Sequence, residues 1–133
     1  MVFNNNAPVF GAPLEMLGYN WWAEGCFSDS TSSRTLPHIV SLSDYGGASN
    51  LTLENGLRAC SAKGYIWCGF EYGQEVYGVS EYEYFNLNTS RNLATTEDGE
   101  AAMVAAGCNY KCTGNSNQAC GGSNRMMVYG NDG

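Results

Sequence analysis

The chain has few charged residues, few prolines and no long apolar run. Its 133 residues include six Lys or Arg against 13 Asp or Glu, which gives a net charge of −7. This charge would repel nucleic acids and anionic membranes, and no cluster of Lys or Arg offsets it. No stretch approaches the roughly 20 apolar residues of a transmembrane helix. We therefore expect neither nucleic-acid binding nor membrane insertion.

Groups that catalysis requires are also scarce. His38, the single histidine, stands beside Pro37 and is a weak basis for a Ser/His/Asp triad. Glu71 and Glu75 could act as the carboxylate pair of a glycosidase, but so small a domain offers little room for a deep cleft. No glycine-rich phosphate loop precedes a helix, and no Cys-x-x-Cys redox motif occurs. These absences predict a protein that is not an enzyme and uses no cofactor.

The chain is instead rich in cysteine and aromatic residues, with six Cys, three Trp, nine Tyr and five Phe. Six cysteines in a short chain indicate disulfides formed in an oxidising compartment. Residues 1–6 fit the start of a mature secreted protein behind an initiator Met. Asn50 and Asn88 begin Asn-x-Thr/Ser triplets and are candidate glycosylation sites. We therefore expect a secreted, extracellular protein.

Hydrophobic periodicity predicts one small α+β domain over residues 18–133, behind an extended arm over residues 1–17. The main helix should begin at the Thr52 cap and end at Gly64, where glycine can take a left-handed conformation. A second, weaker helix is expected over residues 97–106. The segments that favour strands are 19–27, 65–72, 75–79 and 124–129.

Several short motifs follow one another along the chain. The most distinctive is the polar loop between Cys112 and Cys120, followed by two glycines and a strand that ends at Tyr129. A loop this polar has no apolar core, so a Cys112–Cys120 crosslink is expected to clamp it. The earlier motifs are Gly25-Cys-Phe-Ser-Asp29, Thr52-Leu-Glu54 with Cys60, Gly64-Tyr65 leading to Gly69-Phe-Glu-Tyr-Gly-Gln-Glu75, and Cys108-x3-Cys112. Together they resemble the WSC domain, a small cysteine-rich extracellular module that fungal proteins use on polysaccharides.

The resemblance spans about residues 19–130 and implies a disulfide-rich fold of the WSC or PAN type, with an antiparallel sheet packed against one main helix. WSC domains usually carry eight cysteines, and this chain departs from that pattern. By alignment to the motif, Gly56, Val76 and Gly78 stand where the family has cysteine, while Cys68 is new. Gly56 and Val76 are a family pair that has been lost together.

The family pairing, carried over to this chain, implies the disulfides Cys26–Cys108 and Cys112–Cys120. Cys60 is left without its family partner at position 78, and we infer that it pairs with the new Cys68. The rival interpretation is a zinc site that combines the last three cysteines with His38, but the histidine would have to come from far along the chain. We expect three disulfides and no metal.

Sugar-binding sites combine an aromatic platform with a few hydrogen-bonding groups, and strand alternation separates the candidates. Tyr65, Trp67 and Glu71 fall on one face of the strand at 65–72, and Cys68 with Phe70 falls on the other. If Cys68 reaches the helix, the face with Trp67 is the more open one. Trp67 is then either a sugar platform or a residue covered by the N-terminal arm. Of the neighbours Trp21 and Trp22, one should be core.

Further candidates lie in or just after the hairpin and in the last disulfide loop. They are Tyr77, Tyr82, Tyr84, Asn115 and Asn117. Tyr82 and Tyr84 share a strand face, a pattern that half-buried packing also explains. The two loop amides are either sugar ligands or simply solvated.

The resemblance implies a lectin-like module that binds cell-wall polysaccharide such as β-glucan or mannan, or the glycan of a glycoprotein. The alternative is a secreted ligand or effector that meets a protein receptor through an acidic, Tyr-rich surface. The acidic residues of that surface would be Glu81, Glu83, Glu97, Asp98 and Glu100.

Overall fold

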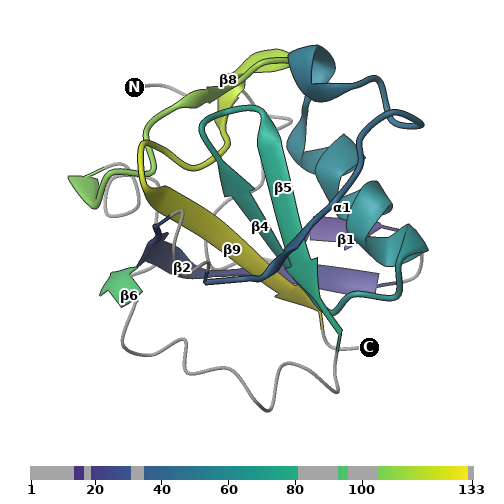
Figure 1. Cartoon of the computed structure of the whole chain (residues 1–133), viewed down its shortest axis with the longest axis horizontal. Helices are drawn as coiled ribbons and strands as arrows, with labels where there is room; N and C mark the ends of the chain where they lie inside the picture. The colour runs from purple at the N-terminus through teal and green to yellow at the C-terminus, as the bar shows by residue number, and fades with distance from the viewer. Residues whose placement is uncertain (1–13, 17–18, 31–34, 81–92, 96–104, 132–133) are drawn as a thin grey trace.

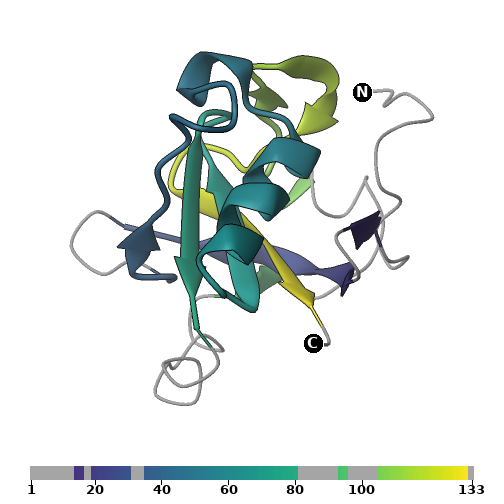
Figure 2. The same ribbon diagram turned by 90° about the vertical axis from the view of Figure 1, so that its right-hand side faces the viewer.

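The computed structural model describes residues 14–16, 19–30, 35–80, 93–95 and 105–131. Within these ranges, one antiparallel sheet packs against one α-helix (Figures 1 and 2). The seven strands run in the order β1-β2-β9-β4-β5-β3, with β6 paired to β2. Their bounds are β1 Leu14–Met16, β2 Tyr19–Ser28, β3 His38–Ile39, β4 Trp67–Glu71, β5 Glu75–Val79, β6 Leu93–Thr95 and β9 Arg125–Asn131. A separate hairpin joins β7 (Lys111–Cys112) to β8 (Asn115–Ala119).

The helix α1 (Leu53–Ala62) forms where its sequence signals place it, after the short 3-10 helix η1 (Ala48–Asn50). The Thr52 hydroxyl accepts the backbone N–H of Asn55 at 3.0 Å and caps the first turn. The chain leaves the helix through Gly64, whose φ is 74°. The prediction of one main helix packed on an antiparallel sheet is confirmed.

The main core lies between α1 and the inner face of the sheet. Figure 2 shows α1 in front of the sheet, seen from the helix side. Leu57 and Cys60 from the helix meet Cys68, Phe70 and Tyr129 from the central strands. Phe70 and Tyr129 pack edge to face, with ring centroids 5.8 Å apart. Cys68 and Phe70 thus face the helix, as strand alternation predicts.

The opposite, outer face of the sheet carries a second and smaller core. Its buried members are Phe27, Leu36, Tyr77, Val79, Met126 and Val128. A Cβ added to Gly69 would lie 2.3 Å from the sulfur of Met126 and 3.2 Å from Leu36, so side chains close the middle of this face. The expectation that the Trp67 face is the open one is therefore wrong at its middle. Leu36, from the turn-rich segment before the helix, covers it.

Three disulfides crosslink the domain, and they use all six cysteines. Cys26 is bonded to Cys108, Cys60 to Cys68, and Cys112 to Cys120. These are the three pairs that the WSC resemblance and the re-pairing of Cys60 imply. The zinc interpretation is wrong, because every cysteine that it needs is bonded to another cysteine.

The positions that lack the family's cysteines lie next to each other in space. A Cβ added to Gly56 would lie 3.2 Å from a methyl group of Val76, so a disulfide between these positions is geometrically reasonable. Cys68 is paired across β4 and β5 with Gly78, where the family has the partner of Cys60. In this chain Cys60 therefore bonds to β4, at the position directly opposite the one on β5 that carries its partner in the family.

Two predicted elements are covered only in part. Of the predicted arm, residues 14–16 are described, and they pair with β2. The predicted helix over residues 97–106 lies almost wholly outside the described residues. Among the helices that the structure describes, none is long and apolar enough to span a membrane.

Candidate functional site

Three residues on adjacent strands form a row across one end of the outer face. Trp22 on β2 pairs with Gly130 on β9, and Gly130 pairs in turn with Trp67 on β4. Directly paired residues project to the same side of a sheet, so the two indoles flank Gly130. The strands that carry the indoles lie two strand spacings apart, about 10 Å. Trp22, Gly130 and Trp67 are called the tryptophan row below.

A carboxylate lies over the middle of the tryptophan row. The pairing of β2 with β9 shifts between Ala23 and Gly25, so Glu24 is the extra residue of a bulge. A Cβ added to Gly130 would lie 2.6 Å from Oε2 of Glu24. Glycine at this position therefore leaves room for the Glu24 carboxylate between the two indoles. The arrangement offers two aromatic surfaces and one strong hydrogen-bond acceptor.

The two indoles differ in how firmly they are held. Trp22 is 38% exposed. Trp67 is half-buried against the second core, with its ring centroid 6.4 Å from that of Phe27 in an edge-to-face arrangement. Trp21 points to the inner face and is fully buried in the main core. Alternation along β2 thus buries one of the adjacent tryptophans and exposes the other, as the sequence predicts.

The pKa of one residue on the inner face of the sheet, Tyr129, is strongly shifted. Burial raises the pKa of the Tyr129 hydroxyl, and the nearby charge of Glu54 raises it further. Tyr129 is therefore a neutral core residue over the whole physiological range. Among the described residues, no group of three or more His, Cys, Asp or Glu could hold a metal ion.

The other candidates on the hairpin strands do not join the row. Tyr65 packs against the backbone of Gly78 and stacks on His38, with ring centroids 6.1 Å apart. Tyr77 is buried, and its hydroxyl donates to Glu75 at 2.8 Å. Glu71 is fully buried, which puts its carboxylate out of reach of a polysaccharide. Strand alternation alone does not reveal this burial, because the covering residues come from distant parts of the chain.

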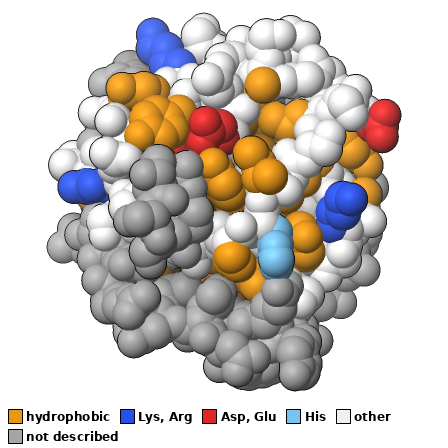
Figure 3. Space-filling model, in the orientation of Figure 1, with side chains coloured by type: hydrophobic (Ala, Val, Ile, Leu, Met, Phe, Trp, Pro, Cys, Tyr) orange, Lys and Arg blue, Asp and Glu red, His pale blue; other side chains and the backbone are white. Residues whose placement is uncertain are grey.

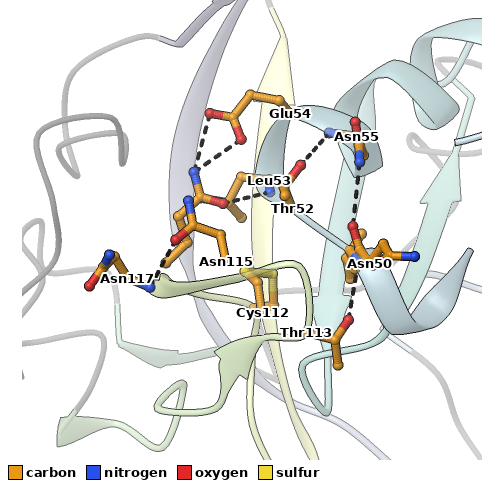
Figure 4. Close-up of a disulfide and its surroundings, with 12 residues drawn as sticks. Asn50, Thr52, Leu53, Glu54, Asn55, Cys112, Thr113, Asn115 and Asn117 are labelled. Atoms are coloured by element: carbon orange, nitrogen blue, oxygen red, sulfur yellow. Dashed lines mark hydrogen bonds between the residues drawn. A yellow bond between two sulfur atoms is a disulfide. The ribbon is translucent and has the colours of Figure 1, made fainter. Parts of the chain in front are cut away.

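The predicted loop amides lie in the hairpin that the last disulfide closes, and this hairpin is tied to the start of α1 (Figure 4). The buried Gln118 accepts the backbone N–H of Leu53 at 3.0 Å and donates to the carboxylate of Glu54 at 3.0 and 3.2 Å. Asn115 accepts the backbone N–H of Asn117 at 2.9 Å. The hairpin is thus rigid, with the Asn117 side chain exposed.

The remaining predicted sites are only partly described. Tyr82, Tyr84, the candidate glycosylation site Asn88 and the acidic residues of the alternative interface lie outside the described residues. Asn50, the other candidate glycosylation site, is exposed at the end of η1, and its side-chain amide donates to the carbonyl of Gly46 at 2.8 Å.

An open groove of about 510 Å³ runs beside the β3–β5 edge of the sheet. Its lining includes Ile39, which is 69% exposed, together with Val40, Leu42 and Glu75. Figure 3 shows apolar side chains gathered on this face with an acidic group among them. The described residues that line the groove include no aromatic ring, so it lacks the stacking surface that the tryptophan row offers.

The described residues form a small α+β domain that is crosslinked by three disulfides and exposes the aromatic rings of Trp22 and Tyr110. Glu71 and Glu75 are directly paired across the hairpin, but the Glu71 side chain is fully buried. The family model of the WSC domain matches residues 23–122, and the chain belongs to this family. Membership supports a carbohydrate-binding module, since WSC domains are generally binding modules without catalytic activity.

Several relatives share this domain. The chain is 31% identical over 111 residues to a WSC domain-containing protein of Arthroderma benhamiae, an alignment that covers 84% of this chain and 10% of the relative. It is 32% identical over 107 residues to a Chaetomium globosum protein named "Putative fungistatic metabolite", covering 80% and 40%. It is 29% identical over 105 residues to "Xylosyltransferase oxt" of Drosophila pseudoobscura pseudoobscura, covering 79% and 10%. The chain therefore spans between a tenth and two fifths of these relatives.

Proposed function

We propose that the chain is a secreted, non-catalytic module that binds cell-wall polysaccharide such as β-glucan or mannan through the tryptophan row. The observation that carries this proposal is the pairing of Trp22 and Trp67 on either side of Gly130, with Glu24 above it. Secretion fits the three disulfides, which form and persist in oxidising compartments.

The chemistry of the row suits a sugar chain. A pyranose presents an apolar C–H face that can pack on an indole, and a rim of hydroxyls that can donate to a carboxylate. The strands of the two indoles are about 10 Å apart, roughly twice the width of one pyranose. The indoles would therefore contact different sugar residues of one chain, with Glu24 accepting hydroxyls between them. A row at the open surface suits a polymer better than a monosaccharide.

The tryptophan row can be tested by titration with soluble oligosaccharides of β-glucan and mannan, followed by NMR. The chain has three Trp and therefore three indole N–H signals. The signals of Trp22 and Trp67 should shift on binding, while that of the buried Trp21 should stay in place. Trp22→Ala should weaken binding about fivefold or more, since desolvated stacking contributes about 1 kcal/mol or more.

Ile39→Ala is the matched control, because Ile39 is another exposed apolar residue, in the groove rather than in the row. Its affinity should stay within about twofold of the unchanged protein. Equal affinity in the Trp22→Ala variant would show that the row does not bind sugar. Release of reducing sugar from either glycan would contradict the non-catalytic part of the proposal.

A further inference from the structure

The turn between β4 and β5 holds a tyrosine in a conformation that tyrosine rarely adopts. Tyr72 has a φ of 56°, and the following Gly73 has a φ of 77°. In this left-handed region the Cβ of a bulky residue crowds the backbone, whereas glycine or asparagine adopts it readily. The chain keeps a tyrosine where a smaller residue would form the turn more easily. Backbone strain of this kind concentrates at functional sites.

The strained tyrosine belongs to an exposed group of aromatic and amide side chains. Its ring packs edge to face against Tyr110, with centroids 6.2 Å apart and planes at 78°. Its hydroxyl donates to Oδ1 of Asn124 at 2.8 Å. Tyr110 is 43% exposed, and Asn124 is exposed as well. Tyr72, Tyr110 and Asn124 are called the tyrosine cluster.

Backbone hydrogen bonds hold the tyrosine cluster in place. The N–H of Tyr72 donates to the carbonyl of Gly122 at 3.3 Å, and that of Gly73 to the carbonyl of Cys120 at 2.9 Å. The N–H of Tyr110 donates to the carbonyl of Gly121 at 2.9 Å. The Cys112–Cys120 disulfide fixes the segment that supplies these carbonyls. A surface fixed in this way loses little conformational entropy when a ligand binds.

The tyrosine cluster is separate from the tryptophan row. Trp67 is the first residue of β4, and Tyr72 follows its last residue, so their backbones are about 16 Å apart along the strand. Figure 1 shows the β4–β5 turn beside β8, at the far end of these strands. Leu36 and Met126 close the middle of the outer face between the two places. A ligand that lies on the row would have to cross this covered stretch to reach the cluster.

We infer that the tyrosine cluster is a second carbohydrate-binding site, independent of the tryptophan row. A pyranose would pack its C–H face on the exposed ring of Tyr110 and the half-buried ring of Tyr72, while its hydroxyls bond the Asn124 amide and the Tyr72 hydroxyl. The ligand class rests on the proposed function, whereas the position of the site rests on the strained turn. A module with two separate sites can bridge two polysaccharide chains.

The decisive variant is Tyr72→Asn, because asparagine tolerates the turn but removes the ring. In an NMR titration with a soluble β-glucan hexasaccharide, the unchanged protein should show two sets of shifted signals, one at each site. Tyr72→Asn should abolish the shifts around Tyr110 and leave the affinity read from the Trp22 indole within about twofold. Its melting temperature should be unchanged or higher, since relief of strain offsets the lost ring contact. Gln74→Ala, an exposed change in the same turn, is the matched control and should alter neither site.

Other outcomes would overturn the inference in distinguishable ways. A variant that melts several degrees lower and binds normally would show that Tyr72 has a structural role only. Binding that depends on Trp22 alone would leave the proposed function standing without a second site. Equal loss of one set of shifts in Tyr72→Asn and Trp22→Ala would indicate one long site. Absence of binding at both places, for glucan and mannan oligosaccharides alike, would overturn the proposed function as well.

Discussion

The inner and outer faces of the sheet are made by the same strands but bury different groups. On the inner face, α1 and the three disulfides contribute to a core that includes Phe70 and Tyr129. On the outer face, the smaller core around Leu36 and Met126 closes the middle. It leaves Trp22 and Glu24 at the surface beside Gly130.

The difference between the faces follows from the side chains of β9, which contributes residues to the cores on both faces. Met127 and Tyr129 point inward and are buried, whereas Gly130 offers no side chain to the outer face. Gly130 therefore leaves a gap in the outer face between Trp22 and Trp67. Substitutions on the inner face should change stability, while substitution of the exposed Trp22 should mainly change binding.

The largest effect should come from removing the disulfide that crosses the inner face. Replacing Cys26 and Cys108 together by Ala should cost about 4–5 kcal/mol of unfolding free energy, because this bond closes a loop with a sequence separation of 82. Replacing Cys112 and Cys120, with a separation of 8, should cost about 2–3 kcal/mol. Guanidinium unfolding of both double variants measures the difference. Equal costs would mean that unfolded-chain entropy does not govern these crosslinks.

Trp67→Ala should have the next largest effect. Trp67 belongs to the tryptophan row and also packs against the second core, so this variant tests both regions of the outer face. Trp67 contacts Phe27 and the second core, so the change should cost about 2–3 kcal/mol, less than for a fully buried tryptophan. Trp22→Ala should cost less than about 1 kcal/mol of unfolding free energy. It should nevertheless weaken sugar binding about fivefold or more. Unfolding curves and titrations of both variants test this. A large stability loss in Trp22→Ala would make it a core residue.

Gly56→Ala should destabilise the inner face by overpacking. A Cβ at this position would lie 2.3 Å from the ring of Phe70, which must shift to admit it. A clash cost of up to about 3 kcal/mol, less the roughly 1 kcal/mol gained in helix propensity, leaves about 1–2 kcal/mol. Thermal unfolding measures it, and adding Phe70→Leu should restore part of the loss. A Gly56→Ala variant at least as stable as the parent would refute this tight packing.

Tyr129→Phe should stabilise the protein slightly. The Tyr129 hydroxyl is buried and has no hydrogen-bond partner in the structure, so its removal should gain up to about 1 kcal/mol. The same hydroxyl should also make the unfolding free energy depend on pH, because the pKa of Tyr129 is raised above its ordinary value of 10 in the folded state. Ionisation of Tyr129 therefore does not affect the unfolding free energy below pH 10. Above pH 10 the unfolding free energy falls, because this tyrosine ionises in the unfolded chain before it ionises in the folded protein. Unfolding between pH 7 and about 11 should show a flatter decline for the Tyr129→Phe variant than for the unchanged protein. A variant that is less stable at neutral pH would show that the hydroxyl has a partner.

Salt should have the smallest effect, because β-glucan and mannan are uncharged and would form no ion pairs at the proposed sugar sites. Affinity in the millimolar to micromolar range, about −4 to −8 kcal/mol, should change by less than about twofold between low and high salt. Titration at the two ionic strengths measures this. A steep loss of affinity with salt would instead favour the receptor-binding alternative and its acidic surface.

The elements that the sequence predicts well are those with local signals. Thr52 and Gly64, which are only about a dozen residues apart, mark the two ends of α1. Strand alternation assigns Cys68 and Phe70 to the inner face. The resemblance to the WSC domain supplies the long-range pairing of Cys26 with Cys108, which no local signal contains. Cys60 and Cys68 are close in sequence, so their pairing needs only a helix end beside a strand.

The features that the sequence does not predict all depend on contacts between distant segments. Trp22 and Trp67 come together because β9, from the end of the described chain, lies between β2 and β4. The burial of Glu71 and the cover over Gly69 likewise depend on side chains from other parts of the chain. The tyrosine cluster joins a hairpin turn to residues around the last disulfide, and only the unusual φ of Tyr72 marks it.

The central position of β9 has a consequence for biosynthesis. When the ribosome has made β2, its partner strand β9 lies about a hundred residues further along the chain and has not yet been synthesised. The Cys60–Cys68 disulfide can close before Cys108 is made, because its loop is short and costs little entropy to close. Cys26 stays near an unpaired strand edge until its distant partners arrive. The nascent chain is therefore exposed to misoxidation and aggregation until residues 125–131 have been made, and a disulfide isomerase should raise its yield.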